Sequence, residues 1–207
     1  MSDSAREPAI APDLARRVRL ALLDVDGVLT DNGLYLGAAA TGPGTAVGAE
    51  APLEFKRFDI RDGLGIRLLV EAGIAVELLS GRPSPATSAR ARELDVPAHQ
   101  VEAGHKLEAA ERILEGHGLD WADVAVVGDD LADLPLLRRA GLPVTVADAV
   151  PEVLAIAGWR TASAGGRGAV REFAEALLEA RGELAGALAA YERARTPAAR
   201  REVTRAG

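Results

Sequence analysis

Three short, largely apolar segments, each ending in polar residues, constrain the fold of this 207-residue chain more than any other feature. They cover residues 19–23, 74–80 and 124–130, and the motifs D-x-D, S-G-R and G-D-D stand at their carboxyl ends. Apolar runs of this length are typical of strands that are buried in a parallel sheet. Because the carboxyl ends of parallel strands lie at one edge of a sheet, we expect the polar residues to meet there.

The rest of the chain continues an alternation of strands and helices. We predict further strands over 99–101, 143–148 and 159–162, and helices over 86–94, 106–115, 131–140 and 169–195. Another helix precedes Gly73, with Asp62 as its N-cap. This alternation predicts an α/β fold, a Rossmann-like doubly wound parallel sheet with helices on both faces.

A β-hairpin insertion is expected over about 33–58, with strands over 34–36 and 53–58. The Gly/Ala-rich segment 37–52 between them is expected to form a mobile or disordered loop. We expect one main domain over 17–182, a flexible N-terminal arm over 1–16, and a C-terminal helix extension with a tail over 183–207.

Composition and charge exclude several classes of protein. The chain has 24 basic and 31 acidic residues, a net charge of −7, which disfavours nucleic acid and anionic membranes as partners. The absence of cysteine excludes disulfides, thiolate metal sites and thiol nucleophiles. The N-terminal residues lack the apolar core of a signal peptide, and no apolar run approaches the length of a membrane span. We therefore expect a cytoplasmic protein.

The side chains at the ends of the three strands have the donors of a phosphoryl-transfer site. Carboxylates after the first and third strands suit a hard cation, above all Mg²⁺, which usually serves phosphate chemistry. Ser80, the amide of Gly81 and the ammonium group of Lys106 would donate to phosphoryl oxygens.

Asp24 and Asp26 lie two residues apart, so strand alternation places both on one face. An ionised Asp24 beside Mg²⁺ would be the nucleophile that forms an aspartyl-phosphate. Asp26 would protonate the leaving alkoxide and then take a proton from the hydrolytic water.

Other readings of these motifs are weaker. A calcium loop that begins at D-x-D-G would need an oxygen ligand at Val28, glycine at Leu29 and glutamate at Tyr35, and it has none of them. The motifs of serine hydrolases and P-loop enzymes are absent. Taken singly, D-x-D would more often be a cap or turn, S-G-R a turn, and Lys106 a solvated helix start. Their order at successive strand ends favours a site.

The segments DVDGVLTDN, SGR, Lys106 and GDDLADLP resemble, in this order, the four motifs of the haloacid dehalogenase superfamily of aspartate-nucleophile phosphatases. The resemblance covers about residues 18–182. It implies Asp24 as nucleophile and metal ligand, and Asp26 as acid/base and backbone-carbonyl ligand. The remaining implied roles are phosphate binding by Ser80, Gly81, Arg82 and Lys106, metal binding by Asp129, and support by Asp130 and Asp133.

The segment between Asp26 and Gly81 is filled by the hairpin, one helix and one strand, which leaves no room for a separate cap domain. FKRFDIRDGLGIRLLVEAGI and AGGRGAVRE resemble the capless phosphatases of 3-deoxy-D-manno-octulosonate 8-phosphate. That resemblance implies an acidic keto-sugar phosphate as substrate and places Arg167 near its phosphate or sugar. It also implies a homotetramer in which the hairpins form a central barrel and neighbouring subunits complete each other's clefts.

Three alternatives stay open at this point: a phosphatase for another keto-acid sugar phosphate, such as a nine-carbon one, a broad sugar-phosphate phosphatase, or a non-catalytic oligomerisation module. The intact set of Asp24, Asp26, Lys106 and Asp129 argues against the module. Whether His105, beside Lys106, touches substrate also stays open.

Overall fold

A six-stranded parallel sheet forms the centre of the molecule. The computed structural model describes residues 9–37, 53–102 and 104–195. The sheet has the order β5-β4-β1-β6-β7-β8, and each neighbouring pair is parallel. Its strands are β1 (Leu20–Leu23), β4 (Ala75–Ser80), β5 (Ala98–Gln100), β6 (Val124–Gly128), β7 (Leu142–Thr145) and β8 (Trp159–Arg160).

The strand order explains why the three apolar runs are continuous. β1 lies between β4 and β6, and all four of its residues are buried. A strand covered by helices on both faces has no solvent side, so polar residues do not alternate with apolar ones.

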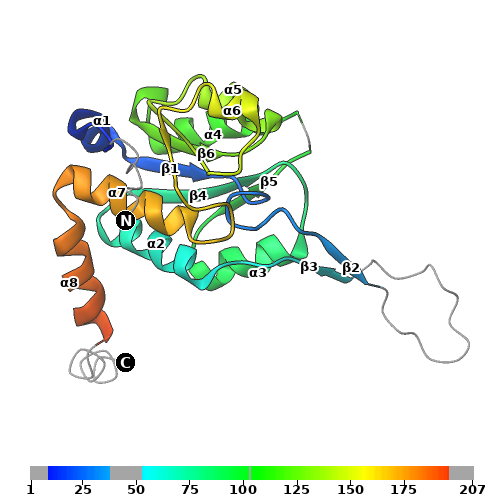
Figure 1. The fold of residues 1–207 in the computed structure, drawn as a ribbon, viewed down its shortest axis with the longest axis horizontal. Coiled ribbons are helices and arrows are strands. Elements are labelled where there is room, and N and C mark those ends of the chain that lie inside the picture. The colour runs from blue at the N-terminus through cyan, green and yellow to red at the C-terminus, as the bar shows by residue number, and fades with distance from the viewer. Residues whose placement is uncertain (1–8, 38–52, 103, 196–207) are drawn as a thin grey trace, which may run out of the picture.

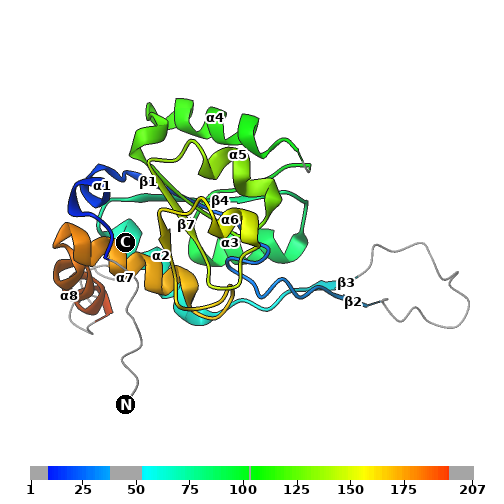
Figure 2. The same ribbon diagram turned by 45° about the horizontal axis from the view of Figure 1, so that its top comes forward.

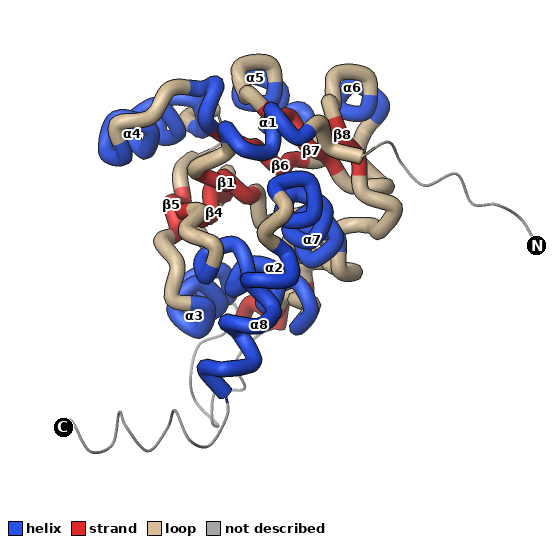
Figure 3. The backbone as a smooth tube through the Cα atoms, turned by 90° about the vertical axis from the view of Figure 1, so that its left-hand side faces the viewer, coloured by secondary structure: helices blue, strands red, loops and turns tan. Residues whose placement is uncertain are grey.

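Helices cover both faces of the sheet. In Figures 1 and 3, α4, α5 and α6 lie on one face, and α2, α3 and α7 lie on the other. The helices are α1 (Pro12–Arg17), α2 (Ile60–Glu71), α3 (Pro85–Leu94), α4 (Lys106–His117), α5 (Leu134–Leu137), α6 (Pro151–Leu154), α7 (Ala169–Arg181) and α8 (Leu184–Arg195), with short 3₁₀ turns η1 (Trp121–Asp123) and η2 (Leu131–Asp133). The predicted α/β class with a doubly wound parallel sheet is confirmed.

The helix predicted over 169–195 is two helices. α7 ends at Gly182, whose φ of +74° is in the left-handed region that suits glycine. The amide of Glu183 donates to the carbonyl of Leu178, which closes the helix end and turns the chain into α8. Because the sequence is Ala-rich on both sides of Gly182, the sequence pattern predicts one continuous helix and does not reveal this break.

Part of the predicted N-terminal arm is folded. Pro12–Arg17 form α1, Ala15 is fully buried, and Arg181 on α7 donates to the carbonyls of Ala15 and Val18 at 2.9 Å each. Within residues 9–16, which the structure describes, the chain therefore packs on α7 and does not form a flexible arm.

The N-cap of α2 is Asp59, not Asp62. Asp59 accepts a hydrogen bond from the amide of Arg61, as a cap does. Asp62 lies one turn further on, is fully buried, and accepts hydrogen bonds from the amides of Gly168 and Arg171. It thus satisfies the free amides at the start of α7 and joins the two helices.

The hairpin insertion projects from the body of the molecule (Figures 1 and 2). It consists of β2 (Tyr35–Gly37) and β3 (Leu53–Phe55), paired antiparallel with Tyr35 opposite Phe55. Tyr35 and Phe55 are 63% and 59% exposed, which is unusual for large apolar side chains. The loop predicted over 37–52 lies outside the described residues, apart from Gly37.

Between the hairpin and β4 the chain forms only α2, so this segment contains no separate cap domain. In the described ranges, none of the helices combines the length and apolar character needed to cross a membrane.

Candidate active site

Three predicted site residues lie at the carboxyl ends of adjacent central strands. Asp24 follows β1, Ser80 ends β4, and Asp129 follows β6. All three are buried. The amide of Asp24 donates to the carbonyl of Val127 at 2.9 Å, which continues the pairing of β1 with β6 and fixes the start of the loop.

Lys106 connects the carboxylates at this edge. It is the first residue of α4, is buried, and donates from Nζ to Asp24 Oδ1 at 2.5 Å and to Asp133 Oδ1 at 2.8 Å. Burial lowers the pKa of Lys106, but the charges of Asp24 and Asp133 outweigh it, so the pKa is raised. The ammonium group is therefore a fixed positive charge beside Asp24.

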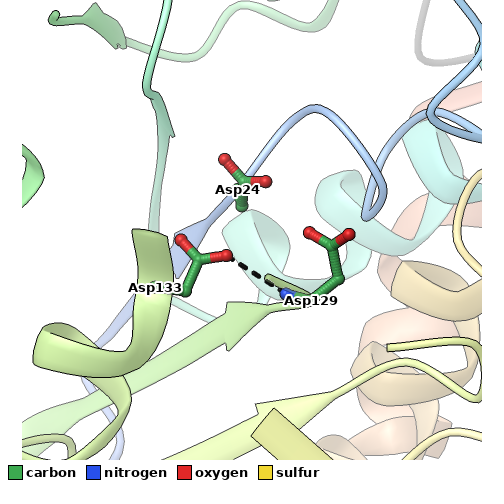
Figure 4. Close-up of side chains that lie close together, drawn as sticks. All are labelled: Asp24, Asp129 and Asp133. Carbon is green, nitrogen blue, oxygen red and sulfur yellow. Dashed lines mark hydrogen bonds between the residues drawn. The ribbon is translucent and has the colours of Figure 1, made fainter. Parts of the chain in front are cut away.

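Asp24, Asp129 and Asp133 lie close together at this edge of the sheet (Figure 4). One ligand oxygen from each lies within 4.8 Å of the others, the only such group among the described residues. Burial, followed by the charge of Asp133, raises the pKa of Asp24 to about 7. Burial, followed by the charge of Asp24, raises the pKa of Asp129 to about 8. Three carboxylates with a single lysine leave the site with too little positive charge to balance the negative charge.

The donor set fits a hard divalent cation in that place. Oδ1 of Asp129 is buried and has no hydrogen-bond partner, so it is available as a ligand. Gly27, with φ of +93°, lets the loop approach Asp129 closely, because a Cβ there would lie 1.9 Å from Asp129 Oδ2. An all-oxygen site with an unsatisfied carboxylate oxygen suits Mg²⁺.

Asp133 has a supporting geometry. Its Oδ1 binds Lys106, and its Oδ2 accepts from the amides of Asp129 and Asp130 at 3.1 and 3.4 Å. Both oxygens are therefore engaged within the protein, and the residue orients Lys106 and the loop after β6. This arrangement supports the role expected for Asp133.

Asp26 faces a second lysine, which the sequence reasoning missed. Lys56 Nζ lies 2.7 Å from Asp26 Oδ1 and 3.0 Å from Oδ2, and it donates to Thr87 at 3.1 Å. The Lys56 side chain is only 1% exposed. It comes from the residue that follows β3, so the hairpin supplies the cation that holds the Asp26 carboxylate.

Lysine usage is a sequence signal that identifies this residue. The chain has only two lysines, Lys56 and Lys106, and its other basic side chains of fixed charge are arginines. The side chains of both lysines are buried, with exposures of 1% and 6%, and both bind carboxylates of the D-x-D motif. Because the chain otherwise uses arginine, each lysine indicates a position that requires a compact point charge.

Arg82 pairs with the hairpin. It donates to Glu54 on β3 at 2.9 Å and lies 3.6 Å from Asp26. Ser80 Oγ donates to the Arg82 carbonyl at 3.1 Å, and Glu54 also accepts from Ser84. The loop after β4 and the hairpin therefore hold each other in place. A phosphate-binding role of Arg82 stays a prediction.

The other predicted site residues lie around the buried cluster. Asp130 accepts from the amide of Leu131 at 2.6 Å and caps η2. Arg167 is 54% exposed at its side chain and donates to Asp31 at 3.2 Å. His105 is 58% exposed and lies 3.6 Å from Glu108. Gly81 lies against Lys106, since a Cβ there would be 3.4 Å from the lysine Cε.

Comparisons with known proteins agree with this geometry. Residues 101–173 match the family model of haloacid dehalogenase-like hydrolases. The chain is 39% identical over 170 residues to the 3-deoxy-D-manno-octulosonate 8-phosphate phosphatase KdsC of Escherichia coli K12, covering 82% of this chain and 84% of that protein.

Solved structures of such phosphatases have the same fold. The Yersinia pestis 3-deoxy-D-manno-octulosonate 8-phosphate phosphatase superposes with a TM-score of 0.76 at 34% identity, covering 87% of this chain and 97% of the other. The Moraxella catarrhalis phosphatase, in complex with magnesium, phosphate and KDO, gives a TM-score of 0.74 at 31% identity with the same coverage.

The carboxylate cluster predicts that the stabilisation of the fold by Mg²⁺ depends on pH. Because folding raises the pKa of Asp24 to about 7 and of Asp129 to about 8, the folded state binds more protons than the unfolded state. Their stabilising contribution is present below about pH 4 and is lost as pH rises through these values. Mg²⁺ competes with the protons, so it should raise the melting temperature more at pH 8 than at pH 5.5.

Thermal unfolding in EDTA and in saturating Mg²⁺ at both pH values measures this difference. Asp129→Asn is the matched variant and should reduce it. An equal Mg²⁺ effect at the two pH values would contradict the linkage.

Proposed function

The chain is a phosphoric monoester hydrolase that belongs to the haloacid dehalogenase superfamily, and we propose that it uses Mg²⁺ to hydrolyse an acidic keto-sugar phosphate of the 3-deoxy-D-manno-octulosonate 8-phosphate type. One observation carries the proposal: buried Lys106 lies between Asp24 and Asp133, next to an Asp129 oxygen without a partner. This arrangement offers a carboxylate that can act as the nucleophile, a fixed cation and a place for a metal. The similarity to KdsC supports the substrate class.

The proposed reaction has two steps. The carboxylate of Asp24 attacks phosphorus, the bond between phosphorus and the sugar oxygen breaks, and Asp26 gives its proton to that oxygen. Water then attacks phosphorus of the aspartyl-phosphate, Asp26 takes the water's proton, and inorganic phosphate leaves with Asp24 restored. Lys106, 2.5 Å from Asp24, lies where its charge can bind the phosphoryl oxygens.

Mg²⁺ would be held by Asp24, Asp129 and the backbone carbonyl of Asp26, and it would offset the negative charge of the nucleophile and the phosphate. Ser80 and the amide of Gly81 are proposed to bind phosphoryl oxygens. Ser80 is the last residue of β4, and Gly81, which follows it, lies against Lys106.

Arginines near the loop after Asp26 support an anionic sugar. Arg57 and Arg167 both pair with Asp31, at 3.7 and 3.2 Å, and both are partly exposed. Arg57 also donates to the carbonyl of Gly166 at 2.5 Å, which joins the hairpin end to the segment around Arg167. We propose that Arg167 binds the phosphate or the acidic sugar. The expected cytoplasmic location stays a prediction.

The hairpin supports the proposed homotetramer. Glu54 on β3 and Lys56 just after it contact the body, whereas Leu53 and Phe55 are exposed. Tyr35 lies opposite Phe55 on β2 and extends the same apolar face. An exposed apolar face on a projecting hairpin suits contact with other copies, which would also bring a neighbour close to Asp26 and Arg82.

Prediction for the nucleophile: Asp24→Asn should lower kcat by several orders of magnitude, because an amide is a very poor nucleophile. A panel of sugar phosphates with wild type should give the highest kcat/KM for an eight-carbon 3-deoxy keto-acid phosphate. Substantial turnover by purified, folded Asp24→Asn would refute the nucleophile assignment. A preference for a nine-carbon keto-acid phosphate would change the proposed substrate but not the proposed reaction.

Prediction for Lys56: replacing it by methionine should lower kcat roughly tenfold to a hundredfold with little change in KM, because Asp26 loses the group that holds it in place. Lys56→Arg should recover part of the loss. The melting temperature of each variant serves as the control. A change in KM with kcat intact would place Lys56 in substrate binding instead.

Prediction for assembly: wild type should sediment as a tetramer, and Tyr35→Glu should shift it to smaller species, because a charge enters the apolar face. Leu14→Glu is the matched control, since Leu14 on α1 is also exposed, at 44%, but far along the chain from the hairpin. Analytical ultracentrifugation measures the mass. A monomeric wild type, or equal effects of the two variants, would contradict this assembly.

A further inference from the structure

Glu77 is a buried carboxylate outside the active site. It lies in β4 among apolar residues, is 8% exposed, and is paired in register with Leu22 of β1. A buried carboxylate is costly unless it is paired, hydrogen-bonded or bound to a metal. The surroundings of Glu77 therefore have to compensate for its charge.

Two histidines surround this carboxylate. His99 on β5 places Nε2 2.6 Å from Glu77 Oε2, and His117 at the end of α4 places Nε2 2.5 Å from Oε1. The three side chains come from three different elements. The chain has only three histidines, so two of them meet at one carboxylate.

The three side chains line a cavity of about 570 Å³ between α4 and the end of the sheet, together with Gln100 and Arg112. The imidazoles are 39% and 33% exposed at their side chains. The rings therefore have solvent access and room to turn, whereas Glu77 is held in the sheet. The charge of Arg112 faces solvent, where screening limits its repulsion of a cation.

We propose that Glu77, His99 and His117 form a binding site for a divalent transition-metal ion such as Zn²⁺. Two imidazole nitrogens and one carboxylate select Zn²⁺, Cu²⁺ or Ni²⁺ and disfavour Mg²⁺, which prefers oxygen ligands. The site therefore differs in donor chemistry from the aspartate cluster beside Lys106.

Metal binding replaces the present hydrogen bonds. Each Nε2 now faces a different oxygen of Glu77, and the ligand atoms of the three residues do not all lie within 4.8 Å of one another. Both rings therefore have to turn toward a common point for the ion to bind. The ion takes the place of the ring protons, and water in the cavity completes its coordination. It would tie β4 and β5 to the C-terminal end of α4, the helix that begins with Lys106.

The first experiment uses the wild-type full chain, with excess Mg²⁺ present to occupy the oxygen site. Zn²⁺ is added, and the ring resonances of the three histidines are followed by NMR. We expect the resonances of His99 and His117 to shift together to saturation at one equivalent, while those of His105 stay in place. No shift, or a shift of His105 alone, would overturn the proposal.

The second experiment compares His99→Gln and His117→Gln with His105→Gln as the matched control. Calorimetry in excess Mg²⁺ should show Zn²⁺ affinity reduced more than about tenfold in the first two variants and unchanged in the control, because loss even of outer-shell partners has such an effect. Equal Zn²⁺ affinity in all three variants would refute the site. Phosphatase activity with Mg²⁺ should be retained in His99→Gln and His117→Gln, and an inactive wild type would contradict the proposed function alone.

Discussion

The buried ammonium group of Lys106 is the interaction on which the rest of the site depends. Asp24, Asp129 and Asp133 would repel one another at their observed spacing, and burial increases the cost. Lys106 offsets part of that charge and fixes one oxygen of Asp24 and one of Asp133. Removing one partner from such a buried pair costs about 3–5 kcal/mol, so the helix start that carries Lys106 serves stability as well as chemistry.

The sheet explains why these groups can lie together at all. β1 is paired with β4 and β6, so three strand ends meet side by side and each contributes the polar residue at its carboxyl end. Asp62 anchors α7 to α2, and Gly27 permits the loop after β1 to approach Asp129. The positions of the site aspartates thus depend on residues that are not themselves reactive.

The sequence predicted the sheet and the aspartates because their signals are local. Apolar runs define the central strands, and the polar residue that ends each run stays next to it in space. Lys56 was missed because its contact with Asp26 is tertiary and depends on where the hairpin returns. The pairing of Arg82 with Glu54 was missed for the same reason, because the two residues are distant in sequence.

Local signals also failed where two of them competed. The Ala-rich segment after Ala169 favours helix on both sides of Gly182, so helix propensity concealed the glycine that ends α7. Asp59 and Asp62 both lie before the largely apolar residues 66–70 of α2, and only packing decides that the first one caps the helix and the second one binds α7. In each case the correct assignment depends on tertiary contacts, which the local sequence does not reveal.

Because side chains alternate along β3 and into Lys56, the hairpin has one face toward the site and one face outward. A shift of one residue in the strand would disrupt both faces. Glu54 and Lys56 face the site, and Leu53 and Phe55 face outward. Since strand side chains alternate, inserting a single residue between Leu53 and Glu54 would turn Glu54 and Lys56 outward and Phe55 toward the site. Apolar groups would then meet Asp26, and charges would cover the outer face. A one-residue insertion here should be more damaging than most substitutions, because it would disable the site and the outer surface together.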